Sequence, residues 1–150
     1  MDSPVVEKPA PVIIDTDMGA DDWMAMLILL RSAKVDVRAV TVTGTGLAHT
    51  DAGTKHALDL LALASHETIP VAKGSSAPLR GSHTFPESWR ESTDRMWGLT
   101  LPPNHYPPTQ KTAVDTIISV IEESPDKVTL LGIRSGGSSS LLEFIFFCVQ

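Results

Sequence analysis

The sequence predicts an α/β fold built on a Rossmann-like, mostly parallel sheet with helices on both faces. Short runs rich in β-branched residues alternate along the chain with segments of helical periodicity. Strands that alternate with helices favour a parallel sheet that is covered on both sides. The chain has 150 residues, of which 42% are hydrophobic, so it is long and apolar enough to bury such a core.

The first predicted unit is a strand, an acidic loop and a buried helix. Residues 1–10 form a flexible lead-in, and the β-branched run at 11–14 predicts a buried strand. Asp21 or Asp22 is suited to open the helix that follows. Residues 23–30 contain no Gly or Pro and place four apolar side chains on one helical face: Trp23, Met26, Leu27 and Leu30.

The same two patterns predict the later elements. We expect strands at 35–43, 69–72 and 128–131, and helices at 51–64 and 111–123. Residues 74–110 hold six of the eleven prolines and predict a long irregular loop, a length typical of functional loops. The composition of 135–140 is that of a flexible linker, and 141–149 is an apolar run with an association surface as its expected role.

Composition argues against several classes of function. The chain carries 12 Lys and Arg against 18 Asp and Glu, a formal net charge of -6, which argues against a nucleic-acid binder. A single cysteine, Cys148, excludes a disulfide framework and a cysteine-based zinc site. No apolar stretch reaches the roughly 18 residues of a membrane span, and the N-terminus has no signal-peptide pattern. We therefore expect a soluble, cytoplasmic protein that acts on neither nucleic acid nor membrane.

Four aspartates, Asp15, Asp17, Asp21 and Asp22, fall within eight residues directly after the first strand. Like charges this close repel one another unless a cation neutralises them, and hard oxygen ligands suit Ca²⁺ or Mg²⁺. In open α/β sheets, ligands bind beyond the carboxyl ends of the strands. The pattern predicts that the two pairs converge on one ion across a tight turn at Gly19. The alternative is that the second pair only caps the helix.

Two other acidic motifs fit less well. An EF-hand counted from Asp15 would need Gly and Glu where this chain has Ala20 and Met26. An aspartyl-phosphate phosphatase that uses Mg²⁺ also begins its loop with Asp-x-Asp after a strand. Such loops usually carry Thr or Val where this chain has Gly19, so the phosphatase stays a weaker alternative.

The segment 15–22, with the sequence DTDMGADD between an apolar strand and the residues WMAM, resembles the signature of the inosine–uridine preferring nucleoside hydrolases. The resemblance continues through 40–44 and runs to about Leu131. It implies that 11–131 is the N-terminal part of a hydrolase domain. It also implies Ca²⁺-dependent cleavage of the N-glycosidic bond of ribonucleosides, giving ribose and free base.

The resemblance also implies roles for individual residues. Asp17 would be both a calcium ligand and the acceptor of a proton from water, which makes it the expected catalytic residue. Asp22 would be a second calcium ligand, Asp21 would bind a ribose hydroxyl, and Asp15 would support the loop or its metal shell. Thr45 stands where many family members place an Asn that contacts ribose.

The chain departs from the family pattern after Leu131, so 132–150 is a divergent tail. Ile133 lies near the position whose backbone carbonyl binds calcium in the family. Family members are longer, and the sheet is therefore expected to be incomplete in its C-terminal half. A second hypothesis follows, in which the chain is a non-catalytic fragment that binds a cation, forms a homo-oligomer or pairs with a full-length relative.

Three residues of the long loop are candidates for contacts with the base. His83 lies in a loop that could close over a ligand, while Trp89 and Trp97 could stack on a nucleobase or simply pack.

Overall fold

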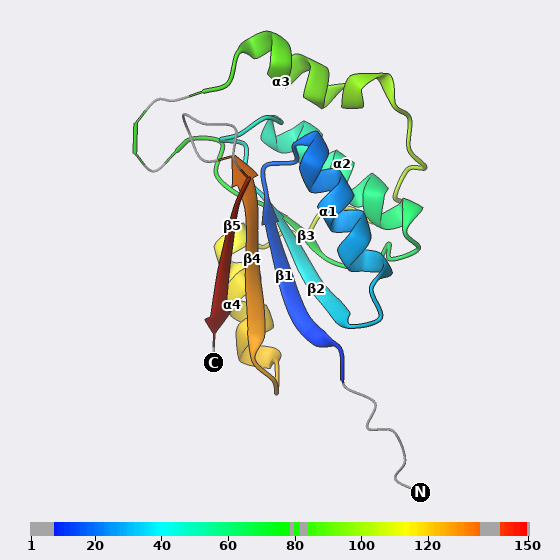
Figure 1. Cartoon of the computed structure of the whole chain (residues 1–150), viewed down its shortest axis with the longest axis vertical. Helices are drawn as coiled ribbons and strands as arrows, with labels where there is room; N and C mark the ends of the chain where they lie inside the picture. Colours follow the sequence, from blue (N-terminus) through cyan, green and yellow to red (C-terminus); the bar gives the residue numbers. More distant parts are fainter. Residues whose placement is uncertain (1–7, 79, 82–83, 136–141, 150) are drawn as a thin grey trace, which may run out of the picture.

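The computed structural model of the chain describes residues 8–78, 80–81, 84–135 and 142–149. They form one five-stranded sheet with helices on both faces (Figure 1). In chain order the elements are β1 (Ala10–Thr16), α1 (Ala20–Arg31), β2 (Val35–Val42), α2 (Thr50–Leu63), β3 (Val71–Lys73), α3 (Glu87–Asp94), the 3-10 helix η1 (Met96–Gly98), α4 (Ala113–Glu123), β4 (Val128–Ser135) and β5 (Leu142–Val149).

The strand order is β3-β2-β1-β4-β5, and the first four strands are parallel. The predicted fold class is therefore confirmed. In Figure 1, α1 and α2 cover one face of the sheet, α4 covers the other, and α3 lies beyond the carboxyl ends of the parallel strands. This edge is where the acidic loop after β1 and the loop after β2 come together.

The central strand β1 is buried on both faces. Ile14 is completely buried in the larger cluster, which β1 and β2 form with apolar side chains of α1 and α2. Its neighbour Ile13 is also completely buried, but it packs in the smaller cluster under Ile117 and Ile121 of α4. Two buried faces explain why this strand is an uninterrupted apolar run and does not alternate with polar residues.

A bulge in β2 adjusts which side chains reach the larger cluster. Val12 pairs with Val37, but Ile13 pairs with Ala39, so Arg38 is an extra residue between them. Because a bulge reverses the alternation of side chains, Val37 and Val40 both enter the larger cluster although they are three residues apart. Ala39 faces the smaller cluster.

Most expected elements are present, with shifted ends. Helix α1 begins at Ala20, earlier than expected, and neither Asp21 nor Asp22 precedes it, since Gly19 is its N-cap. Strand β3 begins only after Pro70, which has no N–H to donate to a neighbouring strand. Helix α4 begins after Thr112, whose hydroxyl accepts a hydrogen bond from the Asp115 N–H.

The expectation that residues 74–110 form an irregular loop is wrong for part of that segment. The structure places α3 and η1 within it. The residues that α3 buries are Arg90 and Thr93, both polar, so the helix has no apolar stripe that a periodicity argument could detect.

The C-terminal expectations also need correction. Strand β4 does not end at Leu131 but continues to Ser135, and it pairs antiparallel with β5. The apolar run after 141 is thus largely a strand, and a short connection suffices because the pairing is antiparallel. Apart from Ser135, the expected linker lies outside the described residues, as do positions 1–7 of the expected lead-in.

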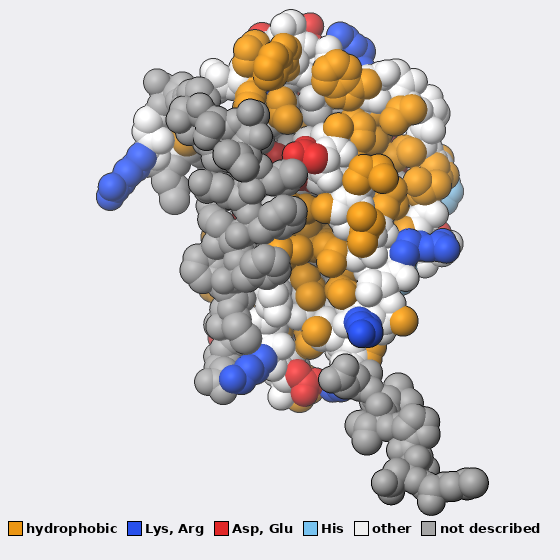
Figure 2. Space-filling view, viewed as in Figure 1, with side chains coloured by type: hydrophobic (Ala, Val, Ile, Leu, Met, Phe, Trp, Pro, Cys, Tyr) orange, Lys and Arg blue, Asp and Glu red, His pale blue; other side chains and the backbone are white. Residues whose placement is uncertain are grey.

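Part of the surface is apolar. Figure 2 shows hydrophobic side chains gathered over the face that α1 covers, and Met24 and Ile28 of that helix are both largely exposed. No helix in the described ranges combines the length and hydropathy needed to cross a bilayer.

The two clusters predict a contrast between two isoleucines. Ile14→Ala, at a position that is 0% exposed, is expected to lower the free energy of unfolding by about 2–5 kcal/mol. Ile28→Ala makes the same chemical change at a position that is 66% exposed, so we expect about 0.5 kcal/mol or less. Urea unfolding of both variants measures the difference, and equal losses would contradict the packing described above.

Candidate functional site

The candidate site lies where two loops meet at the carboxyl ends of β1 and β2. The Thr43 N–H donates to the Thr16 carbonyl oxygen at 2.9 Å, and the Ala48 N–H donates to the Asp17 carbonyl oxygen at 3.2 Å. These backbone hydrogen bonds hold the loop after β2 against the acidic loop after β1. Figure 2 shows acidic atoms reaching the surface close to where α1 begins.

The centre of the site is a pair of buried carboxyl groups. Asp17 is 1% exposed and Asp22 is 2% exposed, and the two side chains share a hydrogen bond. Burial, and after it the neighbouring charge of Asp17, raise the pKa of Asp22 from its ordinary value of 3.8 to about 8. Without a cation, burial and the adjacent charge therefore both favour the protonated form of Asp22 at neutral pH.

Asp22 is also part of the start of α1. One of its oxygens, Oδ2, accepts a hydrogen bond from the Thr16 hydroxyl at 2.6 Å and from the Gly19 N–H at 3.2 Å. The capping interpretation is therefore correct for this residue. It does not exclude the cation interpretation, since the same carboxyl group also contacts Asp17.

The backbone turns sharply at Met18 and not at Gly19, where the sequence had predicted the tight turn. Met18 has a φ of 58°, in the left-handed region, while Gly19 has an extended conformation. Burial of its side chain and two hydrogen bonds hold Met18 in this conformation. The Met18 N–H donates to the Thr16 hydroxyl at 2.9 Å, and the Met18 carbonyl oxygen accepts from the Trp23 indole N–H at 2.9 Å. Such strain typically persists only where surrounding contacts impose it.

The other two aspartates are less buried than this pair. Asp15 is half-buried and accepts a hydrogen bond from the Thr41 hydroxyl at 2.6 Å. Asp21 is exposed, and its Oδ1 would lie 2.6 Å from a side-chain carbon added at Gly19, so a larger residue there would have to displace the Asp21 side chain. The structure thus brings together one carboxylate of each predicted pair.

Two further predicted residues lie near the pair. Thr45 is half-buried, and its hydroxyl lies 3.0 Å from the Thr43 hydroxyl. Ile133 is completely buried, and it lies within β4, opposite Thr16 of β1, and not in a turn after the strand. The roles expected for Thr45 as a ribose contact and for the Ile133 carbonyl as a ligand stay predictions.

The donor set suits a hard cation. Carboxylate oxygens are the ligands that Ca²⁺ and Mg²⁺ prefer, and a cation would relieve the repulsion that keeps Asp22 protonated. Within the described residues, no three or more His, Cys, Asp or Glu side chains come together at a metal site. Asp17 and Asp22 would therefore supply two of the ligands, with backbone oxygen, water or substrate completing the set.

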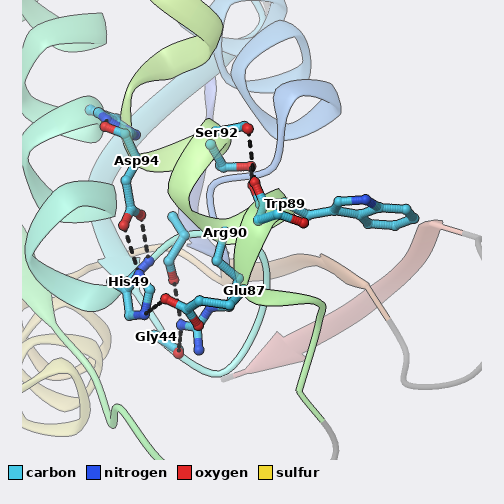
Figure 3. A network of polar contacts seen from close by, with 11 residues as sticks. Gly44, His49, Glu87, Trp89, Arg90, Ser92 and Asp94 are labelled. Carbon is cyan, nitrogen blue, oxygen red and sulfur yellow. Dashed lines mark hydrogen bonds and ion pairs between the residues drawn. The ribbon is translucent and has the colours of Figure 1, made fainter.

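Helix α3 makes contacts with the loop after β2 that the sequence did not predict. Arg90 donates to backbone oxygens of that loop, and Asp94 binds His49 (Figure 3). A lone Arg and a lone Asp in a polar segment carry no sequence signal for such contacts. Trp89 and Trp97 are 55% and 63% exposed, while His83 lies outside the described residues.

Comparisons with known proteins agree on one family. The model of the family described as inosine-uridine preferring nucleoside hydrolase matches residues 12–133. Uridine nucleosidase 1 of Arabidopsis thaliana is 33% identical over 129 residues, which is 86% of this chain and 38% of the relative. The pyrimidine-specific ribonucleoside hydrolase RihA of Salmonella arizonae is 32% identical over 88% of this chain and 42% of the relative.

Solved structures give the same result. A plant nucleoside hydrolase is 35% identical, with a TM-score of 0.69 over 83% of this chain and 39% of its own. An inosine-guanosine nucleoside hydrolase is 26% identical, with a TM-score of 0.67 over 83% of this chain and 37% of its own. The chain therefore spans about two fifths of the length of these relatives.

The raised pKa of Asp22 predicts how stability depends on pH without divalent cations. Between pH 3.8 and about 8 the folded chain keeps a proton that the unfolded chain loses, so the free energy of unfolding falls as pH rises. The slope is at most about 1.4 kcal/mol per pH unit for one proton. Asp22→Asn has no proton to lose and is expected to remove this slope in urea unfolding across that range.

Asp36→Asn is the matched control, because Asp36 is exposed on β2 and should leave the slope intact. If the free energy of unfolding depends on pH equally in Asp22→Asn and in the unsubstituted chain, the pKa of Asp22 is not raised in the folded state.

Proposed function

Because the chain belongs to the inosine-uridine preferring nucleoside hydrolase family, we propose that its acidic site serves Ca²⁺-dependent hydrolysis of the N-glycosidic bond of ribonucleosides, giving ribose and free base. The observation that carries this proposal is the buried pair of Asp17 and Asp22 in contact at the carboxyl edge of the sheet. Both residues lie inside the matched segment 12–133, which supports the proposal that 11–131 is the N-terminal part of a hydrolase domain.

Asp17 is the proposed base. When bound, calcium supplies positive charge that acidifies water and holds ribose hydroxyls. The Asp17 carboxylate accepts a proton from the attacking water, a role that favours a carboxylate fixed in place and shielded from bulk solvent. Asp22 would add a second carboxylate charge beside that of Asp17 once it releases its proton to solvent, which a bound cation would favour.

Asp21 and Thr45 are the proposed contacts to ribose. Asp21 is exposed beside the buried pair, so its carboxylate is free to accept hydrogen bonds from sugar hydroxyls that approach from solvent. The half-buried hydroxyl of Thr45 comes from the neighbouring loop. Hydrogen bonds to sugar hydroxyls stabilise an oxocarbenium-like transition state in other glycoside cleavages. Asp15, bound to Thr41, supports the loop.

A pyrimidine nucleoside is the proposed first substrate. One relative is named a uridine nucleosidase and another a pyrimidine-specific ribonucleoside hydrolase. A solved structure of similar fold belongs to an inosine-guanosine hydrolase, so inosine is the appropriate comparison substrate.

A second candidate function is that of a non-catalytic module that binds a cation. The observation that favours it is the extent of the match, which covers 38% and 42% of two relatives. The two candidates share the same cation site and differ in turnover. The family assignment leaves the phosphatase alternative without support.

Ribose release tests the proposal directly. The chain is incubated with uridine or inosine, with calcium or with a chelator, and reducing sugar is measured. We expect release that depends on calcium and falls by at least about 10²-fold in Asp17→Asn, because the proposed base is lost. Asp36→Asn removes an exposed carboxylate from β2 and should behave as the unsubstituted chain does.

Calorimetric titration with calcium separates the two candidates. Calcium binding without ribose release would support the non-catalytic module. If the chain neither binds calcium nor releases ribose, the proposed function is overturned.

A further inference from the structure

We propose that Arg90 of α3 is a positioning residue, which holds the Asp17 carboxylate in place through the turn formed by residues 44–48. This proposal rests on the proposed function, because it assigns Arg90 a role at the same site. Arg90 lies 73 positions after Asp17 in the sequence, in the segment expected to be irregular.

Arg90 contacts both ends of the turn. Its Nη2 donates to the Gly44 carbonyl oxygen at 2.8 Å and to the Ala48 carbonyl oxygen at 3.3 Å. Figure 3 shows the guanidinium group beneath α3, beside the Gly44 carbonyl. One nitrogen thus ties together the two ends of a five-residue turn. Because both carbonyl oxygens bind the same nitrogen, these hydrogen bonds restrain the distance between the two ends.

The middle of the turn lies directly against the Asp17 side chain. A side-chain carbon added at Gly46 would lie only 1.9 Å from Asp17 Oδ2, which means that the backbone there touches the carboxylate. The Ala48 N–H also donates to the Asp17 carbonyl oxygen at 3.2 Å. A shift of the turn would therefore move the Asp17 carboxylate or open space beside it.

Helix α3 has an attachment that does not involve Arg90. Asp94 accepts hydrogen bonds from the His49 N–H at 2.9 Å and contacts His49 Nδ1 at 2.7 Å (Figure 3). The Asp94 carbonyl oxygen also lies 2.9 Å from His56 Nε2 of α2. Replacing Arg90 should therefore leave α3 attached, and the effect on the turn can be measured separately.

The burial of Arg90 favours a role that needs its hydrogen bonds. The residue is only 9% exposed, and its Nε is buried with no hydrogen-bond partner. Burying a guanidinium with incomplete hydrogen bonding costs free energy that an apolar side chain of similar length would avoid. This cost indicates that Arg90 is present for the hydrogen bonds that Nη2 donates to the turn.

Three variants test the proposal. Arg90→Met keeps the length and removes the donors, Arg90→Lys keeps one charged donor group, and Arg95→Met is the control at the exposed end of α3. Two readouts are used: hydrogen–deuterium exchange of the peptide that contains 43–49, and calcium affinity by calorimetry. Thermal unfolding confirms that each variant is folded.

We expect Arg90→Met to speed exchange at 44–48 and to weaken calcium binding about tenfold or more, the usual effect of losing a group that supports a metal ligand. Arg90→Lys should recover part of both properties, and Arg95→Met should change neither. A folded Arg90→Met chain with unchanged exchange, or with unchanged calcium affinity, would overturn the proposal.

Calcium binding and ribose release by the unsubstituted chain are measured first, because these results separate this proposal from the proposed function. If that chain binds calcium, the proposed cation site stands and the variants decide the role of Arg90. If it binds none and releases no ribose, the proposed function fails, and the positioning role fails with it.

Discussion

The structure of the site depends on one electrostatic constraint, the contact between two buried carboxyl groups, Asp17 and Asp22. A proton or a cation must lie between them, because two bare negative charges are too costly in a buried environment. The backbone around them is shaped accordingly. The left-handed turn at Met18 lets the chain leave β1 and enter α1 at once, while Thr16 donates its hydroxyl to Asp22.

The loop after β2 packs closely against this pair. Gly46 has no side chain that would collide with the Asp17 carboxylate, and the turn that contains it is tied to α3 by Arg90. The acidic pair thus has backbone against it on the side of the second loop, while Asp21 is exposed. A carboxyl pair that is held in place in this way suits a group that must exchange a proton with a bound molecule.

Some elements could be predicted from sequence because their buried faces are apolar. The run at 11–14 and the face of Trp23, Met26 and Leu30 are buried as their patterns indicate. Helix α3 could not be predicted in this way, since it buries Arg90 and Thr93. Strand β5 was missed for a different reason, because a short apolar run has no periodicity that distinguishes a strand from an association surface.

The sequence by itself determined the fold class, the family and the local cluster of four aspartates, because these depend on residue types at short spacings. Only the tertiary structure decided which aspartates meet: Asp17 and Asp22 touch, while Asp15 binds Thr41 of the next strand. It also decided that Arg90 reaches the turn beside Asp17. Contacts between residues far apart in the chain depend on the path of the backbone, which local patterns do not specify.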